Sequence, residues 1–370
     1  MTVLRNVMPS KKNKHLLIMA AGTGGHIFPG LAIAAEMQQQ GWSVSWLGTK
    51  SGMEGEIVAK HGIHMDQLDF TGLRGKGWRH SISGAFKLVS SFFACISIVR
   101  KCKPDVVLGM GGYVTVPGGI VSALMGKPLV LMNADAPLLL SNKALKFFAK
   151  KLMFGLPSNA PMQEQKFVFT GNPIRREITQ LGLPQERYAQ HQGPLKILVV
   201  GGSLGARVLN EAVPDALEKI PIDQRPVVTH QSGKQHVEKL RQRYAENAVQ
   251  AEVLDFIHDM PRRYAEADLV ICRAGAITVS ELTAVGVASV LVPLVASSTS
   301  HQKANAEWLS QTGGAVHLPQ TELDSSRLAE LIQSMQRERC LQMAQAAYQM
   351  GKRDANQTIA TILENLAQEK

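Results

Sequence analysis

The sequence predicts an α/β protein made of two doubly wound domains, each with a parallel sheet and helices on both faces. Three observations favour this class. Short Val, Ile and Leu runs alternate with amphipathic stretches, several of these runs end in glycine, and the whole pattern occurs twice. With 370 residues and 45% hydrophobic content, the chain is large enough for two domains that each bury a core.

The first half is expected to open with a β-strand that runs directly into a glycine loop. The helix after that loop should begin at Pro29, because proline at a first helical position forgoes no helical hydrogen bond. The expected strands of this half lie at 15–20, 43–47, 105–108 and 128–131, and the expected helices at 29–40 and 82–100.

The second half repeats the arrangement, with a strand, a glycine-rich loop and a helix that begins at Arg207. Its expected strands lie at 196–200, 226–230, 253–257, 268–272 and 288–293, and further helices at 261–267 and 278–285. Glycine and proline at 171–173 indicate the hinge, so we expect domains at 1–172 and 173–354. Residues 355–370 have helical periodicity without a strand partner, and we expect them to cross back to the first domain.

Charge is distributed unevenly between the two halves. Residues 1–172 hold 19 Lys and Arg against 8 Asp and Glu, whereas the remainder holds 21 against 22. A basic half indicates a surface that faces something anionic, either nucleic acid or an acidic membrane. The sequence has no RNP-like run, zinc finger or Arg-rich helix, which argues against nucleic acid. The four scattered cysteines indicate reduced thiols, and no histidine cluster has metal-ligand spacing.

Three glycine-rich segments follow expected strands. They are Gly22–His26, Gly109–Gly112 and Gly201–Ala206. Backbone N–H groups at a helix N-terminus stabilise phosphate through hydrogen bonds and through the helix dipole. A single glycine turn is as often a tight turn and nothing more, but three of them favour phosphates bound in both domains.

A nucleotide-diphosphate site is indicated more specifically by residues 272–281. None of the loops reads G-x-G-x-x-G, so a dinucleotide cofactor is disfavoured. The strand expected at 268–272 ends before a helix whose first turn should carry Ser280 and Glu281. A carboxylate there can accept hydrogen bonds from both hydroxyls of a ribose, while neighbouring N–H groups hold a diphosphate.

Seven motifs occur in one order from about residue 15 to the C-terminus. They are the segments at 22–30, 73–77, 109–113, 171–175, 201–203, 230–234 and 272–281. Together they resemble the MurG family of N-acetylglucosaminyltransferases. The resemblance implies a GT-B fold, in which two Rossmann-like domains face each other across a cleft. It also implies an inverting, metal-independent enzyme without a cofactor.

The resemblance further implies the reaction and its place in the cell. GlcNAc would move from UDP-GlcNAc to the 4-hydroxyl of MurNAc-pentapeptide on undecaprenyl diphosphate, converting lipid I to lipid II. The enzyme would be peripheral on the cytoplasmic face of the bacterial inner membrane. We expect an anionic membrane surface to be bound through about residues 73–101, where Arg74, Lys76 and Arg79 precede an unusually apolar helix. The alternative is that this helix is a buried crossover.

The site residues follow from the same resemblance. Thr23, Gly24 and Gly25 would lie near the donor sugar, Arg175 and Ser203 near the diphosphate, and the backbone of Ile257 against uracil. Ala276, Ile277, Thr278, Val279 and Ser280 would wrap the nucleotide, Glu281 would bind the ribose, and Gln302 would bind GlcNAc hydroxyls.

His26 is the favoured catalytic base, because an imidazole with an ordinary pKa near 6.5 suits proton transfer at neutral pH. Asp135 or an ordered water is the alternative. Asp135 also belongs to a departure from the family, since Met132-Asn133-Ala134-Asp135 stands where His-Glu-Gln-Asn is usual. We expect Asp135 to face a sugar hydroxyl and not the phosphates, because like charges repel.

Other functions remain open at this level. A two-lobed binding module would need no turnover. Another GT-B lipid glycosyltransferase or a UDP-GlcNAc epimerase would share the architecture, but an epimerase has no need of a basic apolar face.

Overall fold

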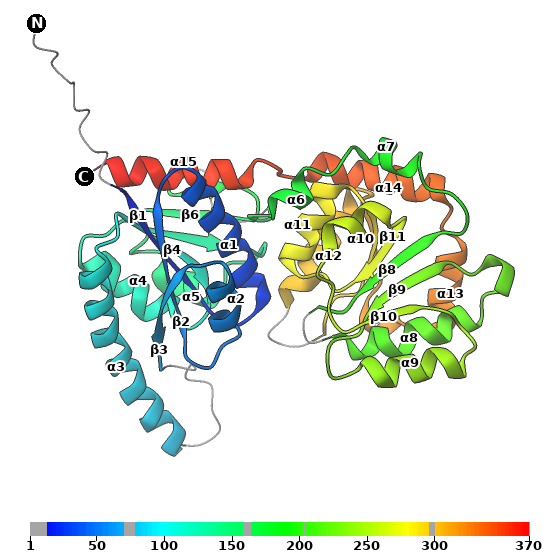
Figure 1. Ribbon diagram of the computed structural model, residues 1–370, viewed down its shortest axis with the longest axis horizontal. Helices are drawn as coiled ribbons and strands as arrows, with labels where there is room; N and C mark the ends of the chain where they lie inside the picture. The colour runs from blue at the N-terminus through cyan, green and yellow to red at the C-terminus, as the bar shows by residue number, and fades with distance from the viewer. Residues whose placement is uncertain (1–12, 70–77, 158–163, 203–204, 296–299, 370) are drawn as a thin grey trace, which may run out of the picture. The chain divides into compact units, whose positions relative to one another are not determined.

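The computed structural model describes residues 13–69, 78–157, 164–202, 205–295 and 300–369, and only the backbone of residues 78–86 and 300. Two parallel sheets organise the chain (Figure 1). Contacts divide it into unit 1, which comprises Met1–Leu131, Ala144–Lys150 and Ile359–Lys370, and unit 2, which comprises Met132–Lys143 and Lys151–Thr358.

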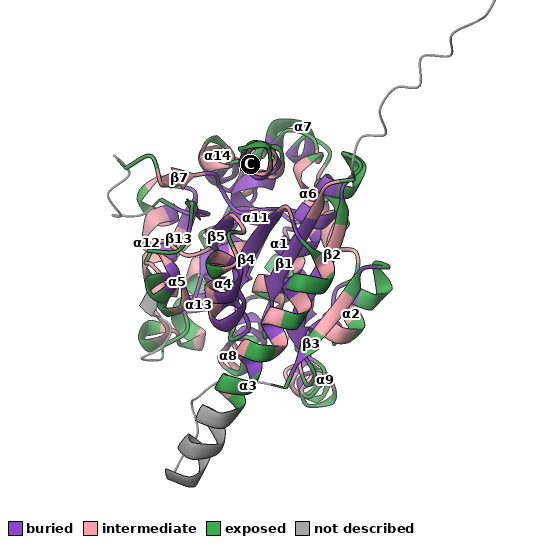
Figure 2. Ribbon diagram, turned by 90° about the vertical axis from the view of Figure 1, so that its left-hand side faces the viewer, coloured by how far each residue is buried: buried purple, intermediate pink, exposed green. Residues whose placement is uncertain are grey.

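The first sheet has the order β3-β2-β1-β4-β5-β6-β7. Its strands are β1 (His15–Ala20), β2 (Ser43–Thr49), β3 (His64–Leu68), β4 (Val106–Gly111), β5 (Leu129–Asn133), β6 (Lys151–Phe154) and β7 (Phe167–Phe169). Its helices are α1 (Gly24–Gln39), α2 (Glu54–Lys60), α3 (Trp78–Cys102), α4 (Thr115–Leu124) and α5 (Leu140–Leu145). The strands β1 and β4 are buried along their whole described length except for half-buried His15 (Figure 2). Continuous apolar strands are typical of a sheet covered on both faces.

The second sheet has the order β10-β9-β8-β11-β12-β13. Its strands are β8 (Lys196–Val200), β9 (Val227–Gln231), β10 (Glu252–Leu254), β11 (Leu269–Cys272), β12 (Ala288–Leu291) and β13 (Ala315–His317). Its larger helices are α8 (Arg207–Glu218), α9 (Val237–Glu246), α10 (Met260–Glu266), α11 (Ala276–Val285), α12 (Ser300–Gln311), α13 (Ser325–Gln333) and α14 (Arg337–Met350). The short helices α6 (Arg176–Thr179) and α7 (Pro184–Tyr188) precede it.

Alternate residues of β8 enter two different cores, as the two-residue period of a strand requires. Ile197 and Val199 pack with α8, α9 and α13, whereas Leu198 and Val200 pack with α10, α11 and α12. The helix α15 (Ala355–Gln368), drawn in red in Figure 1, returns to unit 1. There Glu364 forms an ion pair with Lys14, which precedes β1.

Several expected boundaries are wrong: the helix expected at 82–100 spans Trp78–Cys102, and the strand expected at 253–257 spans Glu252–Leu254. Three further errors bear on the candidate site. The first helix begins at Gly24 instead of Pro29, which lies inside it. The strand expected at 105–108 spans Val106–Gly111 and therefore includes two glycines that read as a loop. Packing requires glycine at 109, where a side chain would lie 2.6 Å from Thr115 and 2.9 Å from Leu131.

The third error concerns Glu281. It was expected in the first turn of its helix, but α11 begins at Ala276, so Glu281 is the sixth helical residue. Ser280 and Glu281 therefore lie in the second turn of α11 instead of the first.

Candidate active site

The strand order of the first sheet reverses between β1 and β4, and ligands of doubly wound sheets bind at such a point. The loops after these two strands are in contact. The amide of Ala21 donates to the carbonyl of Gly111 at 3.3 Å. A side chain at Gly112 would lie 2.4 Å from the carbonyl oxygen of Ala21, so only glycine permits this approach. The sequence-predicted glycine segments at 22–26 and 109–112 are therefore brought together.

Thr23 is the N-cap of α1, and its side chain makes no capping hydrogen bond. Its carbonyl accepts from the amide of His26 at 3.0 Å. Thr23 and Gly25 are exposed and Gly24 is half-buried. Helix N-termini present amides that the helix itself does not use, so this end of α1 can bind a hydroxyl or an anionic oxygen.

His26 is half-buried on the first turn of α1. Its Nδ1 lies 3.1 Å from the carbonyl oxygen of Ala21. A carbonyl oxygen can only accept, so Nδ1 carries the proton in this contact and Nε2 is the basic nitrogen of the neutral ring. The ring lies against Gly111, where a Cβ would come within 2.7 Å of it. This tautomer suits a general base that acts through Nε2.

The second sheet reverses its order between β8 and β11. The loop after β8 contains Ser203, which lies outside the described residues. The loop after β11 leads to Gly275, the N-cap of α11, and the amide of Val279 donates to the Gly275 carbonyl at 2.9 Å. The residues Ala276, Ile277, Thr278, Val279 and Ser280 thus form the first turns of this helix. Ser280 is buried, and its hydroxyl accepts from Asn172 at 2.9 Å.

Glu281 is paired with the predicted diphosphate-binding arginine. One carboxylate oxygen accepts from Nη2 of Arg175 at 3.2 Å, and the other accepts from the Tyr264 hydroxyl at 3.1 Å. The Glu281 side chain is only 12% exposed. Burial raises the pKa of Glu281 above its ordinary value, and Arg175 and Tyr264 offset part of that rise.

Asp135 lies beside the helix that carries Gln302. Its Oδ1 accepts from Nδ2 of Asn305 at 3.0 Å, and the same nitrogen donates to the carbonyl of Ala274. The side-chain oxygen of Gln302 accepts from the amide of Leu294 at 3.0 Å. That contact leaves the NH₂ group as the end of Gln302 suited to donate to a sugar hydroxyl.

Ile257 follows β10 and has a buried side chain that packs in the core beside Val270 and Ala276. The side chain anchors this loop, so a planar base could contact only its backbone. Among the described residues, no group of three or more His, Cys, Asp or Glu side chains could hold a metal ion.

Several residues that organise the site were not predicted. Asn133 is fully buried and donates to the carbonyls of Asp135 and Pro137 while accepting from the amide of Leu139. It thereby shapes the turn that carries Asp135. Tyr264 was also missed, because a tyrosine in an amphipathic helix carries no distinctive signal. Asn172 lies within the motif at 171–175, but no role of its own was predicted for it.

Comparisons with known proteins identify the family of the chain. The glycosyltransferase family 28 N-terminal domain matches residues 16–154, and the glycosyltransferase family 28 C-terminal domain matches residues 196–359. A Janthinobacterium sp. (strain Marseille) protein is 64% identical over 95% of this chain and 99% of its own length. Its name is UDP-N-acetylglucosamine--N-acetylmuramyl-(pentapeptide) pyrophosphoryl-undecaprenol N-acetylglucosamine transferase. The crystal structure of Acinetobacter baumannii MurG has a TM-score of 0.79 at 37% identity and covers 95% of this chain and 99% of that one.

The chain belongs to the MurG family.

Membership of the MurG family makes the chain a glycosyltransferase and confirms the predicted GT-B class of two Rossmann-like domains. The UDP-GlcNAc 2-epimerase of Neisseria meningitidis has a TM-score of 0.64 at 13% identity and covers 95% of this chain. That similarity shows a common fold only. Family membership, and not the fold, therefore separates a MurG transferase from the epimerase alternative and from a binding module.

Proposed function

We propose that this chain moves GlcNAc from UDP-GlcNAc to the 4-hydroxyl of MurNAc-pentapeptide on undecaprenyl diphosphate, with inversion at the anomeric carbon. The observation that carries the proposal is the 64% identity, over nearly the whole chain, with a relative named for this transfer. The product would be lipid II, an intermediate of peptidoglycan synthesis.

The donor would bind mainly to unit 2. Glu281 accepts two hydrogen bonds in the described structure, and a carboxylate has about four lone-pair positions, so two remain for the ribose hydroxyls. The amides at the start of α11, with Arg175 and Ser203, would hold the diphosphate. The backbone of Ile257 would meet uracil, and Gln302 and Asp135 would bind sugar hydroxyls. Thr23, Gly24 and Gly25 of unit 1 would approach the sugar.

His26 would act as the base. Its Nε2 takes the proton of the acceptor 4-hydroxyl while that oxygen attacks the anomeric carbon from the face opposite UDP. The bond from the anomeric carbon to the diphosphate oxygen breaks, and UDP leaves with the electron pair. Arg175 and the amides of α11 stabilise the charge that grows on the leaving diphosphate.

We also propose a division of labour. Residues 1–172 would bind the acceptor and the membrane, residues 173–354 would bind UDP-GlcNAc, and residues 355–370 would join the first domain. None of the helices in the described ranges is long and apolar enough to cross a bilayer. Unit 1 does carry exposed apolar side chains at Val89 and Phe93 on α3, at Leu124 on α4, and at Phe147.

The helix α3 has one buried face and one exposed face. Ser91, Cys95 and Val99 repeat every four residues and are buried, as in a crossover helix. On another face, Phe93 is 69% exposed. Lys146 lies over the ring of Phe147, which is 80% exposed, so apolar and cationic groups are adjacent on this unit. Such a combination binds anionic bilayer surfaces.

The membrane proposal can be tested by co-sedimentation with vesicles that contain anionic lipid. Replacing Phe93 with serine should weaken binding by about tenfold, and glutamine at Arg74, Lys76 and Arg79 together should abolish most of it, although the first two lie outside the described residues. Ile222 of unit 2 is also exposed and apolar, so Ile222→Ser is the matched control. Unchanged sedimentation of both test variants would contradict the proposal.

The reaction is tested by measuring UDP release from UDP-GlcNAc with and without a lipid I analogue. We expect release to depend on the acceptor and to yield the disaccharide. Release without acceptor, accompanied by a change in the sugar, would favour the epimerase instead. His26→Ala should lower turnover by roughly 10²-fold or more; near-normal turnover from pH 6 to 9 would remove His26 from the role of base.

A further inference from the structure

A buried carboxylate that the proposed mechanism does not use lies behind the first glycine loop. Glu54 is the first residue of α2 and is 0% exposed. Its Oε1 accepts from the amide of Thr49 at 2.8 Å and from the Thr49 hydroxyl at 2.6 Å. Its Oε2 accepts from the amide of Gly22 at 3.3 Å. Each of these three contacts, all with described residues, comes from a donor, which is the pattern that an ionised carboxyl accepts.

The surrounding backbone leaves room for this carboxylate. A side chain at Gly52 would lie 2.0 Å from Oε2 of Glu54, and one at Gly48 would lie 2.9 Å from its Cγ. Gly22 has a φ of +100°, a conformation that side chains rarely adopt. The carboxylate therefore bridges the end of β2, at Thr49, to the loop after β1.

The bond to Gly22 connects Glu54 to His26 through a single peptide group. The amide of Gly22 donates to Glu54, and the carbonyl of the same peptide, which belongs to Ala21, lies 3.1 Å from Nδ1 of His26. A peptide group is planar, so its two ends move together. A carboxylate on its N–H also polarises its carbonyl, which then accepts more strongly.

We infer that Glu54 is a positioning residue for His26 and acts through the Ala21–Gly22 peptide. This inference rests on the proposed role of His26 as base. Glu54 fixes the orientation of the Ala21 carbonyl, and that carbonyl holds the proton on Nδ1 and keeps Nε2 basic. When Nε2 takes the proton of the acceptor hydroxyl, the ring becomes cationic, and the polarised carbonyl stabilises the charge. No covalent bond to Glu54 forms or breaks.

The groups that face His26 come from three elements. The Ala21 carbonyl at the end of β1 links it to Glu54 on α2, and Gly111 of β4 contacts the ring. Two residues beyond Gly111, the phenol of Tyr113 is half exposed. Glu54 and Tyr113 are the ionisable side chains on these segments that lie nearest in sequence to the groups facing His26.

The first test is direct and needs no substrate. The imidazole nitrogens are followed by NMR in the full-length protein labelled at histidine, and His26 is assigned among the 11 histidines by its loss in His26→Gln. In the wild type we expect the tautomer with the proton on Nδ1. Glu54→Gln, which keeps the shape and removes the charge, should lower the pKa of His26 by roughly 0.5–1 unit and weaken the preference for this tautomer.

Thr49→Val is the matched control, because it deletes a hydrogen bond to the same carboxylate but keeps the charge and the Gly22 contact. It should leave the titration of His26 within about 0.2 units. Glu54→Asp keeps the charge on a shorter side chain and should fall between the wild type and Glu54→Gln. An unchanged His26 in Glu54→Gln, or an equal shift in Thr49→Val, would overturn the inference. Should Glu54→Gln not fold, the pKa of His26 in Glu54→Asp is compared with that in Thr49→Val. A lower pKa in Glu54→Asp supports the inference, and equal values overturn it.

Kinetics then separate this inference from the proposed function. With UDP-GlcNAc and a lipid I analogue, Glu54→Gln should lower kcat by about tenfold or more, change KM for UDP-GlcNAc by less than about threefold, and move the acid limb of the pH profile to lower pH. If Glu54→Gln lowers the pKa of His26 but His26→Ala keeps its turnover, the influence of Glu54 on His26 is supported and the assignment of His26 as base fails. If His26→Ala is inactive but Glu54→Gln leaves His26 unchanged, the base assignment stands and the role of Glu54 fails.

Discussion

Strand β11 has a buried acidic residue near each end, and comparing the two separates a structural charge from one suited to bind a ligand. Asp268 immediately precedes the strand and is 0% exposed. Glu281 lies on the helix that follows the strand and is 12% exposed. Each carboxylate is paired with an arginine, so burial and ion pairing alone do not distinguish them.

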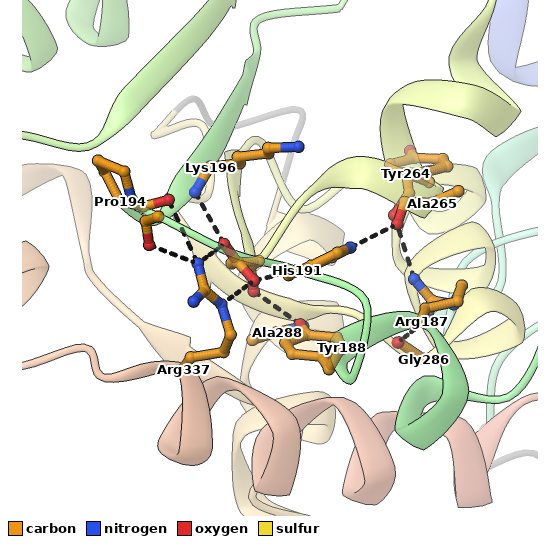
Figure 3. Close-up of polar contacts among 12 residues, drawn as sticks. Arg187, Tyr188, His191, Pro194, Lys196, Tyr264, Ala265, Gly286, Ala288 and Arg337 are labelled. Carbon is orange, nitrogen blue, oxygen red and sulfur yellow. Dashed lines mark hydrogen bonds and ion pairs between the residues drawn. The ribbon is translucent and has the colours of Figure 1, made fainter.

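The two differ in how many hydrogen bonds they accept. Arg337 donates to both oxygens of Asp268 at 3.0 and 3.2 Å, the amide of Lys196 donates at 2.8 Å, and Nδ1 of His191 lies at 2.7 Å (Figure 3). These contacts use all of the roughly four lone-pair positions of a carboxylate. Among the described residues, Glu281 accepts only from Arg175 and Tyr264.

The pKa values follow this difference. Burial alone would raise the pKa of Asp268, but Arg337, the Lys196 amide and His191 outweigh it and hold that pKa below its ordinary value. Burial prevails at Glu281, whose pKa is raised. The carboxylate at the amino end of the strand is therefore satisfied by the fold itself. Glu281, beyond the carboxyl end, keeps lone pairs that can accept hydrogen bonds from a ligand, and its ionisation in a buried position lowers the stability of the fold.

The largest effect that tests this comparison is on folding. Asp268→Asn leaves the Arg337 guanidinium without its anionic partner, and breaking a buried pair in this way costs about 3–5 kcal/mol of the free energy of unfolding. Urea denaturation measures the loss. The variant should keep its KM for UDP-GlcNAc under conditions in which it is folded. A loss below about 1 kcal/mol would show that Asp268 does not hold this region together.

The next effect is on donor binding. Glu281→Ala removes both proposed bonds to ribose, which corresponds to about 2–3 kcal/mol, or a 30- to 150-fold rise in KM for UDP-GlcNAc. Calorimetry with UDP should show the same loss, while kcat at saturating donor changes little. The comparison fails if Glu281→Ala lowers the free energy of unfolding as much as Asp268→Asn does but binds UDP normally.

Much of this fold could be predicted because its signals are local. The apolar runs that became β1, β8 and β11 stand out against their glycine-rich neighbours, and strand positions came within a few residues of the structure. The errors occurred where packing overrode local preference. Gly109 and Gly111 read as a loop but lie within β4, since only glycine fits against Thr115 and the His26 ring.

The candidate site divides in the same way. His26, Glu281 and Asp135 were predicted because they belong to recognisable motifs next to strand ends. Glu54 and Asn133 were not, because their importance depends on which distant backbone groups they meet. The bond from Glu54 to Gly22 joins residues 32 positions apart, and no periodicity or spacing carries that information.

A smaller effect is expected at a third carboxylate, Asp135, which accepts from Asn305. An asparagine at this position can also accept through its carbonyl, so Asp135→Asn should stay within about tenfold of wild-type turnover, whereas Asp135→Ala should lose more. Turnover of both variants at saturating substrates decides whether Asp135 binds a sugar hydroxyl or acts as the catalytic base. A collapse of Asp135→Asn by more than about 10³-fold would transfer the role of base from His26 to Asp135.

The smallest effect, the pH dependence of stability, has opposite signs at the two ends of β11. The lowered pKa of Asp268 means that its contribution is present above the pKa of an unfolded aspartate and is lost as pH falls through the folded value. The raised pKa of Glu281 means that the folded state binds the proton more tightly, so ionisation of this group costs stability as pH rises from its ordinary value through the folded value. Relative to wild type, Glu281→Gln should therefore be equally stable at acid pH and become the more stable of the two as pH rises towards neutrality. Asp268→Asn should do the reverse, with its deficit smallest in acid and growing as pH rises. The stability window of Asp268 lies below the ordinary aspartate pKa of 3.8, and that of Glu281 lies above the ordinary glutamate pKa of 4.5. Urea denaturation of the three proteins from about pH 2.5 to pH 7 therefore covers both windows. Parallel curves for the two variants would mean that both carboxylates serve the fold in the same way.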